Sequence, residues 1–280
     1  MARTPASQTL TSQTLTSQPL VIFGITGRMG QSLIAALREE PAFHLLGAVA
    51  SAESVRLGQD AAAEGRPTGV QITADYAKSL KTGAVAVDFS VGSAVAAHAR
   101  ACSEAGVPLL VGATALDAAA AAELERAARS IAVLVAPNTS VGVAALSLLV
   151  AQAARVLGES YDVEISEAHH REKRDAPSGT ALHLGESVAK TRGHTLNELA
   201  VFDRHGADAA RRTGSIGFSV VRAGDIVGEH TVTFAAAGER LELTHRTTDR
   251  TIFARGALRA AAWLIGRPAG MYGMKDVLGL

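Results

Sequence analysis

The chain has 280 residues, 48% of them hydrophobic, and its 27 lysines and arginines equal its 27 aspartates and glutamates in number. This length predicts one large domain or two ordinary ones, with enough apolar residues for a substantial core. Balanced charge gives no broad basic surface, so we expect no nucleic-acid partner. No apolar run reaches the about 18 residues that a membrane span needs, so we expect no membrane partner.

The single cysteine, Cys102, excludes an intramolecular disulfide framework and favours a reducing compartment, so we expect a cytoplasmic protein. Residues 1–19 are rich in Ser, Thr and Gln and lack the apolar core of a signal peptide. We predict a disordered leader here, with an organelle transit peptide as the alternative.

The first strand, turn and helix carry three glycines. Residues 20–23 form a short apolar run that is typical of a buried parallel strand, and a helical stretch begins at Gln31. Between them lie Gly24, Gly27 and Gly30, spaced G-x-x-G-x-x-G. This context favours dinucleotide binding, because glycines let the backbone approach a pyrophosphate and the helix N-terminus faces its charge. A glycine turn that serves only packing is the alternative.

The end of the second predicted strand, residues 43–50, should meet the adenosine ribose of a dinucleotide. An acidic residue there binds the 2′-hydroxyl of NAD and repels a 2′-phosphate. This chain has Ser51 followed by Ala52, and Arg28 could help to neutralise a phosphate. The pattern slightly favours NADPH over NADH, although Glu53 argues against it. Arg28 is equally consistent with a solvated residue at a helix start.

Three later apolar runs alternate with alanine-rich helical stretches: residues 84–89, 107–111 and 131–136. The alternation predicts an α/β fold with a Rossmann-like, doubly wound parallel sheet. Ligands bind outside the carboxyl ends of such strands, so we expect Ser90, Thr114 and Asn138 on the cofactor side. Each of the three would also suit a helix cap or a turn.

Residues 140–157 predict a long apolar helix, which we interpret as the hinge to a second domain. Residues 214–221, 229–236 and 239–245 then read as strands with hairpin-like links, which indicates a separate sheet of mixed or antiparallel type. A four-strand sheet with an apolar face commonly needs a partner, so we expect some self-association. The expected organisation is a leader (1–19), a dinucleotide-binding domain (20–139 and 250–280) and a substrate-binding and oligomerisation domain (140–249).

Residues 167–181, EAHHREKRDAPSGTA, concentrate polar chemistry between an alternating strand and a helix. Free N–H groups at the helix start, beside the hydroxyls of Ser178 and Thr180, make a seat for an anion such as a carboxylate. Lys173 adds a positive charge, and His169 or His170 can exchange a proton near neutral pH. The stretch therefore predicts a small-molecule active site. No further convergent ligands accompany the histidines, so we expect no metal site.

The pattern E-x-H-H-x-x-K-x-D-x-P-S-G-T-A resembles that of the dihydrodipicolinate reductase (4-hydroxy-tetrahydrodipicolinate reductase) family of bacterial lysine biosynthesis. The resemblance runs from about residue 20 to the C-terminus, and it includes RAGDIVGEH at residues 222–230 and GRMG at residues 27–30. It implies a homotetramer assembled through the second-domain sheets. It also implies that a cyclic imine dicarboxylate loses water and accepts hydride from NADPH or NADH at ring C4.

Residue by residue, the resemblance implies that His169 is the proton donor and Lys173 its catalytic partner. The residues implied to hold the substrate carboxylates are His170, Ser178, Gly179 and Thr180. The cofactor-binding residues that the glycine turn and the resemblance together predict are Gly24, Gly27, Arg28, Met29, Gly30, Ser51, Gly112, Ala113, Thr114, Ala136, Pro137, Asn138 and Thr139. The chain reads Gly-Ala-Thr-Ala where the family usually has Gly-Thr-Thr-Gly, and a backbone contact would survive that change.

Glu167 and Asp175 are interpreted as partners that orient the histidine and the lysine, and not as acid catalysts. The segment from Arg222 to His230 is consistent with a hairpin that has a charged rim, whereas the resemblance implies that it lies beside the site and in the oligomer. Neither Arg222 nor His230 is interpreted as catalytic. One rival is another two-domain dehydrogenase, which would not need the His-His-x-x-Lys and Pro-Ser-Gly-Thr pattern. A second rival is a nucleotide-sensing protein, which would be expected to lose His169 or Lys173.

Overall fold

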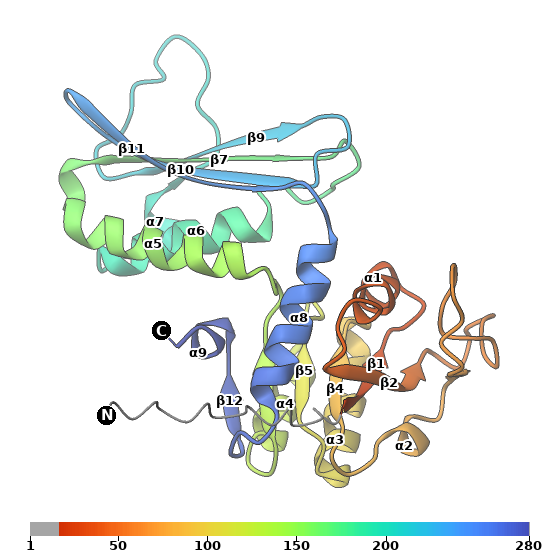
Figure 1. Ribbon diagram of the computed structural model, residues 1–280. Helices are drawn as coiled ribbons and strands as arrows, with labels where there is room; N and C mark the ends of the chain where they lie inside the picture. The colour runs from red at the N-terminus through yellow and green to blue at the C-terminus, as the bar shows by residue number, and fades with distance from the viewer. Residues whose placement is uncertain (1–16, 280) are drawn as a thin grey trace, which may run out of the picture.

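The computed structural model describes residues 17–279 and contains two sheets, one above the other in Figure 1. The first has seven strands in the order β12-β6-β5-β4-β1-β2-β3, and all its pairs are parallel. Its strands are β1 (Gln18–Phe23), β2 (Phe43–Val49), β3 (Ile72–Thr73), β4 (Val85–Asp88), β5 (Leu109–Val111), β6 (Ala132–Val135) and β12 (Gly270–Tyr272). The predicted Rossmann-like parallel sheet is therefore confirmed.

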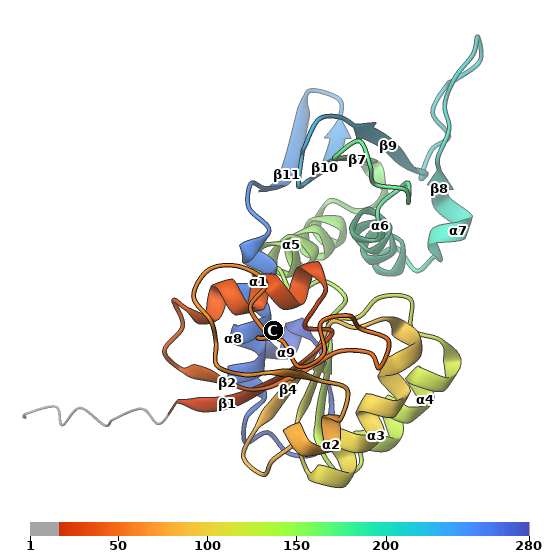
Figure 2. The same cartoon turned by 90° about the vertical axis from the view of Figure 1, so that its right-hand side faces the viewer.

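Helices cover both faces of this sheet, as Figure 2 shows: α3 and α4 lie on one side, and α1 and α8 on the other. The helices of this part are α1 (Arg28–Leu37), α2 (Tyr76–Ser79), α3 (Val95–Ala105), α4 (Ala118–Ala127), α8 (Thr251–Leu264) and α9 (Met274–Val277). Because both faces are covered, the central strands consist mainly of apolar residues, and residues 20–23 of β1 are fully buried.

Strand β1 begins two residues earlier than the sequence predicted. Gln18 and Pro19 pair with Phe43 and His44 of β2, whereas β4 joins β1 only from Leu20 onward. A proline, which has no N–H group, is tolerated at the first residues of a strand, where only one neighbour is present. Residues 18 and 19 therefore belong to the sheet and not to the predicted leader. Residues 1–16, on which the rest of that call falls, lie outside the described residues.

The second sheet has the order β11-β10-β7-β9-β8, with β7 at its centre, parallel to β9 and antiparallel to β10. Its strands are β7 (Asp162–His169), β8 (Ala200–Val201), β9 (Ile216–Arg222), β10 (Gly228–Ala236) and β11 (Glu239–Thr247). The mixed type was predicted correctly. The sequence indicated four strands and not five, because β8 has only two residues and leaves no alternating pattern.

Helices α5 (Val141–Leu157) and α6 (Gly179–Thr191) cover the apolar face of this sheet, and the short α7 (Leu196–Leu199) lies beside them (Figure 1). Ile165 and Phe234 project from the sheet into one buried cluster with Leu146 and Leu184 of the two helices. The apolar face is therefore satisfied within the chain. The opposite face carries polar side chains such as Thr231 and Arg246 and is not covered by helices within residues 17–279, so the expected self-association stays a prediction.

The link between β9 and β10 is not the hairpin that the sequence indicated. The two strands flank β7 on opposite sides, so the link crosses the carboxyl end of β7. There the N–H of Ala223 donates to the carbonyl of His169 (2.9 Å), and the N–H of Arg171 donates to that of Gly224 (3.2 Å). This crossing places Arg222 and His230 on either side of β7, which two paired strands could not do.

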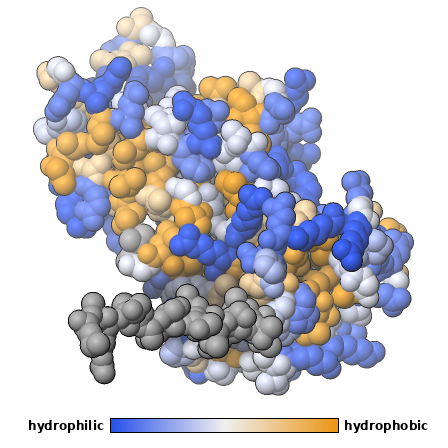
Figure 3. All heavy atoms as spheres, viewed as in Figure 1, coloured by the Kyte–Doolittle hydropathy of each residue, from blue (hydrophilic) through white to orange (hydrophobic). Residues whose placement is uncertain are grey.

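Helix α5 and the turn after it, Val141–Ser160, form 20 residues that are long and apolar enough to cross a membrane by length and composition. The expectation that no run has this length is wrong. Core helices pass the same test, and α5 packs against α6 and β11. Its outer side is nevertheless apolar, with Leu149 53% and Val156 81% exposed, and Figure 3 shows hydrophobic side chains gathered over this region.

Candidate active site

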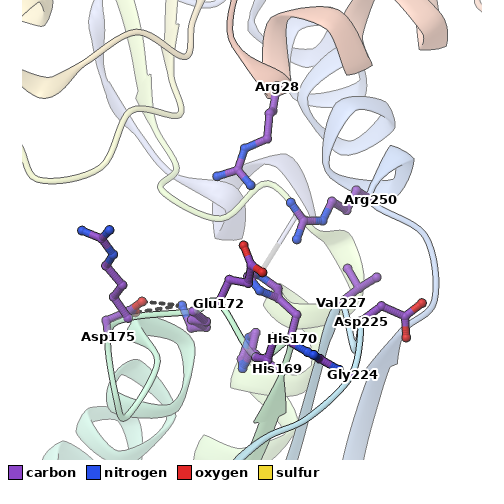
Figure 4. Close-up of a pocket in the computed structure, with 12 residues that line it drawn as sticks. Arg28, His169, His170, Glu172, Asp175, Gly224, Asp225, Val227 and Arg250 are labelled. Carbon is purple, nitrogen blue, oxygen red and sulfur yellow. Dashed lines mark hydrogen bonds and ion pairs between the residues drawn. The ribbon is translucent and has the colours of Figure 1, made fainter.

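A cavity of about 1300 Å³ opens between the two sheets, at the carboxyl end of β7 (Figure 4). Arg28 and Arg250 line it from α1 and from the start of α8. The remaining lining residues come from the second sheet and its loops: His169, His170, Arg171, Glu172, Lys173, Arg174, Asp175, Gly224, Asp225 and Val227. Five arginines or lysines face three acidic residues, so the cavity favours an anionic ligand.

Glu167 is the buried centre of the site, with 2% of its surface exposed. Arg222 donates to both its oxygens, from Nη1 to Oε2 (2.7 Å) and from Nη2 to Oε1 (2.8 Å). Oε2 also contacts Nδ1 of His169 (2.6 Å), and Oε1 accepts the backbone N–H of Ser178 (2.9 Å). Two neighbouring strands and the start of α6 thus converge on one carboxylate.

The same contacts determine the protonation states of Glu167 and His169. Burial raises the pKa of Glu167, but the hydrogen bonds from Arg222 and His169 outweigh it, so the pKa lies below its ordinary value. Desolvation lowers the pKa of His169, and the hydrogen bond to Glu167 opposes this without reversing it. Glu167 is therefore an ionised partner of His169, as the sequence indicated, and not an acid.

Lys173 is held by the second predicted carboxylate, Asp175. Its Nζ donates to both oxygens at 2.8 Å, the pair of dashed lines in Figure 4. Burial raises the pKa of Asp175, but the hydrogen bond from Lys173 overrides that effect and the pKa is lowered. The carbonyl of Asp175 accepts a hydrogen bond from Nη2 of Arg222 (2.7 Å), so the loop that carries Lys173 is tied to the same arginine as Glu167.

The start of α6 lies beside this network and does not line the 1300 Å³ cavity. Ser178 caps the helix, accepting the N–H of Ala181 (3.2 Å) at Oγ, and Oγ also contacts Nε2 of the buried His230 (2.9 Å). Gly179 is exposed. Thr180 accepts a hydrogen bond from Nδ2 of Asn138 (3.1 Å), which joins the seat to the end of β6 in the other domain.

The glycine turn fits a dinucleotide phosphate. Gly27 is the N-cap residue of α1 and provides no side-chain hydrogen bond, and residues 26–28 are exposed. The N–H groups of the helix start therefore remain open to an anion. A Cβ on Gly30 would lie 2.5 Å from the carbonyl oxygens of Gly24 and Ile25, so only glycine lets the helix approach the strand this closely. Arg28 leaves the same turn and reaches the cavity.

The other predicted cofactor residues follow strand ends at the same edge of the sheet. Ser51 is exposed after β2, and Gly112, Ala113 and Thr114 follow β5, while Ala136, Pro137, Asn138 and Thr139 follow β6. Ala113 and Ala136 are buried, so only their backbone could meet a ligand. Thr139 is also buried and donates from Oγ1 to the carbonyl of Phe253 (2.6 Å), so its side chain fastens α8 and is not free for a cofactor. Met29, inside the first turn of α1, is half-buried.

Both parts of the chain match one family. Residues 18–139 match the family described as "Dihydrodipicolinate reductase, N-terminus", and residues 142–278 match "Dihydrodipicolinate reductase, C-terminus". The chain belongs to the dihydrodipicolinate reductase family. It is an oxidoreductase, and membership implies a nicotinamide cofactor and a small-molecule substrate.

Similar proteins agree with this assignment. A 4-hydroxy-tetrahydrodipicolinate reductase of Anaeromyxobacter dehalogenans is 49% identical over 93% of this chain and 97% of its own length. A relative of the same name from Thiobacillus denitrificans is 47% identical over 93% and 98%. Among solved structures, a dipicolinate-bound dihydrodipicolinate reductase from Paenisporosarcina sp. TG-14 has the same fold, with a TM-score of 0.72 and 20% identity over 93% of this chain and 99% of that one.

In this dihydrodipicolinate reductase family member, sequence reasoning missed the parts that Arg222 and His230 play. The register places His230 opposite Glu167, and Arg222 opposite His169. The available clue was Glu167, which occupies an inward position of an alternating strand, where a buried charge needs partners. Within residues 17–279 no group of three or more His, Cys, Asp or Glu is arranged to hold a metal ion.

Proposed function

We propose that this chain reduces 4-hydroxy-tetrahydrodipicolinate to tetrahydrodipicolinate in diaminopimelate and lysine biosynthesis. Substrate, one hydride and one proton give the product and one water. Family membership supports the reaction, and the observation that carries the proposal is the cavity in which a histidine, a lysine and an adjacent anion seat meet an arginine of the dinucleotide turn. Residues 20–139 and 250–280 would hold the cofactor, residues 140–249 the substrate, and closure between them would exclude water.

The nicotinamide cofactor supplies hydride to ring C4, and the residues of the chain handle charge and protons. His170 and the turn of Ser178, Gly179 and Thr180 hold the substrate carboxylates. A carboxylate beside His169 raises the pKa of its imidazole, which loads the histidine with the proton that it donates to the adjacent ring carbon. Lys173 exchanges Asp175 for the substrate and stabilises the negative charge that develops in the ring.

The cofactor is proposed to be NADPH or NADH, with a slight preference for NADPH. Support comes from the end of β2, where Ser51 is exposed, and from Arg28 at the edge of the cavity. We further propose a cytoplasmic homotetramer without a membrane or nucleic-acid partner. The tetramer is supported by the family resemblance and by the polar sheet face that α5 and α6 leave uncovered, and light scattering of the purified protein would test it.

The deciding experiment is the oxidation of NADPH and NADH, in parallel, with substrate made in situ by the preceding synthase from pyruvate and aspartate semialdehyde. We expect oxidation that depends on substrate, and the ratio of the two rates will show whether Ser51 at the end of β2 goes with a preference for NADPH. Folded protein that binds cofactor and turns nothing over would sink the reductase proposal and favour a nucleotide-sensing protein.

A further inference from the structure

Arg222 contacts both the partner of His169 and the loop that carries Lys173. It ends β9 directly opposite His169, the end of β7. Its guanidinium grips both oxygens of Glu167 and also donates to the carbonyl of Asp175. One planar group therefore joins the partner of His169 to the loop of Lys173, which the three donors of a lysine ammonium could not reproduce in this fork geometry.

The contacts of Glu167 decide which nitrogen of His169 carries a proton. A carboxylate has about four acceptor positions, and Glu167 fills them with Arg222 twice, the N–H of Ser178 and Nδ1 of His169. An ionised carboxylate cannot donate, so Nδ1 of His169 must be the donor. The exchangeable position is therefore Nε2, which lies 3.1 Å from where a Cβ on Gly228 would be, so glycine there makes room for the ring.

We propose that Arg222 is a positioning residue of the reductase: through Glu167 it fixes His169 with Nε2 as its proton-exchanging atom, and through the carbonyl of Asp175 it holds the Lys173 loop in register with that histidine. The inference rests on the proposed role of His169 as proton donor. It gives the RAGDIVGEH segment a function that the family assignment alone does not.

The charge of Arg222 matters as much as its geometry. Without Arg222, His169 would be the only cationic partner of the Glu167 carboxylate. The pKa of His169 would then rise, and its imidazolium would release the proton poorly. The groups facing His169 from the surrounding elements are Glu167, Arg222, Lys173 and the neutral His230, with Arg28 and Arg250 across the cavity. Both Lys173 and Arg222 oppose protonation of His169, whereas Glu167 favours it.

The test is the pH dependence of kcat in Arg222→Met and Arg222→Lys. Because His169 acts in its protonated form, activity falls as pH rises through its pKa in the bound complex. Arg222→Met should move this alkaline limb to higher pH by about one unit, the low end of what a neighbouring charge produces. It should also lower kcat by roughly 10²-fold, with little change in KM for the cofactor. Arg222→Lys, which keeps the charge but loses the fork, should return the limb towards the wild-type pH while kcat recovers only in part.

The matched control is Arg126→Met, because Arg126 also pairs with a nearly buried glutamate, Glu123, but on α4 of the other domain. It should leave the limb and kcat unchanged. A folded Arg222→Met enzyme with an unmoved limb would mean that Arg222 only stabilises the fold. If Arg222→Met does not fold, the double variant Arg222→Met/Glu167→Gln removes both charges. The proposal says that Arg222 acts through Glu167, so an alkaline limb that still moves to higher pH in this double variant would overturn it.

A second measurement is independent of turnover. Selective ¹⁵N labelling of the histidines, with His169 assigned by His169→Asn, reports the protonated nitrogen in the resting protein. We expect Nδ1–H in the wild type and a mixture of tautomers in Arg222→Met. An Nε2–H tautomer in the wild type would refute the positioning role even if the enzyme is active. The expected tautomer in a protein without activity would instead mean that the proposed function alone has failed.

Discussion

The two helix starts for which we propose ligands, those of α1 and α6, are built in opposite ways. The start of α1 depends on glycines: Gly27 gives no side-chain cap, and Gly30 has no Cβ to keep the helix away from the strand. The start of α6 is held by side chains: Ser178 caps the helix, its N–H donates to Glu167, and its hydroxyl contacts His230. Both starts present backbone N–H groups and a positive dipole end.

The difference matches the tasks that we propose for them. A diphosphate is large and doubly charged, so an uncapped backbone turn can bind it wherever the chain comes close enough. A substrate carboxylate must be placed against a proton donor within a fraction of an ångström, which needs rigid neighbours. The α6 start is therefore braced by three adjacent strands, and the α1 start by the packing of one helix on one sheet.

The largest expected effect is on the α6 side. Lys173→Ala removes the cation beside the proton donor and should reduce kcat by roughly 10²- to 10³-fold. Cofactor affinity, measured by quenching of fluorescence on titration with NADPH, should remain nearly that of the wild type. Weak cofactor binding in this variant would contradict the separation of the two starts into cofactor and substrate sites.

A change at the α1 start should weaken cofactor binding and leave the substrate site intact. In Gly30→Ala the new Cβ would lie 2.5 Å from two carbonyl oxygens, so the turn must shift. Overpacking of about 1–3 kcal/mol should weaken cofactor binding about tenfold or more. If the proposed function holds, the affinity for dipicolinate, which the Paenisporosarcina protein binds, should not change, as calorimetry would show. Ser32→Ala is the matched control, because this half-buried residue lies on the same helix and its hydroxyl donates only to the carbonyl of Arg28. An unaltered cofactor affinity in Gly30→Ala would disprove the role of this turn.

A smaller effect concerns stability and pH at the α6 side. Desolvation by burial lowers the pKa of His230 to about 4, against 6.5 ordinarily. The unfolded chain therefore binds more protons between these values, and stability falls as pH drops through that window. From pH ~7 to pH ~5 this group should cost about 2 kcal/mol. His230→Gln should lack this contribution, so denaturant titrations at one protein concentration should show a wild-type minus variant difference that shrinks with falling pH. A constant difference would contradict the buried neutral histidine.

The smallest effect is expected at the N-terminus. Removing residues 2–16 should leave activity and unfolding midpoint unchanged, because among residues 17–279 the first strand pairing in the sheet is Gln18 with Phe43. A deletion that extends through Pro19 is the contrast, since it removes two paired residues and should lower the midpoint. A marked loss of activity in the shorter deletion would show that the leader contributes to one of the two sites.

Prediction from sequence succeeded where a local pattern and the final contact coincide. Strands β1, β2, β4, β5 and β6 could be predicted because they are apolar runs, and the glycine turn is visible because it is continuous in the chain, whereas the two-residue β3 was not predicted. The pairings of Glu167 with His169 and of Lys173 with Asp175 are two residues apart, so they could be anticipated. The start of β1 was predicted two residues too late, because proline is typical of loops. Pro19 fits the strand since it pairs with β2 alone and β4 joins only from Leu20 onward.

The local patterns of the chain were enough to predict a glycine turn between a strand and a helix, two histidines and a lysine before a capped helix, and a mixed second sheet. Which other groups join these residues depends on how the strands pair. Arg222 and His230 lie 55 and 63 residues beyond Glu167 in the chain, and they reach it only because β9 and β10 pair with opposite edges of β7. Strand order is a property of the whole sheet, since it depends on which edges are free when the chain collapses. A segment such as RAGDIVGEH therefore reads as a hairpin until the strand between its two ends is seen.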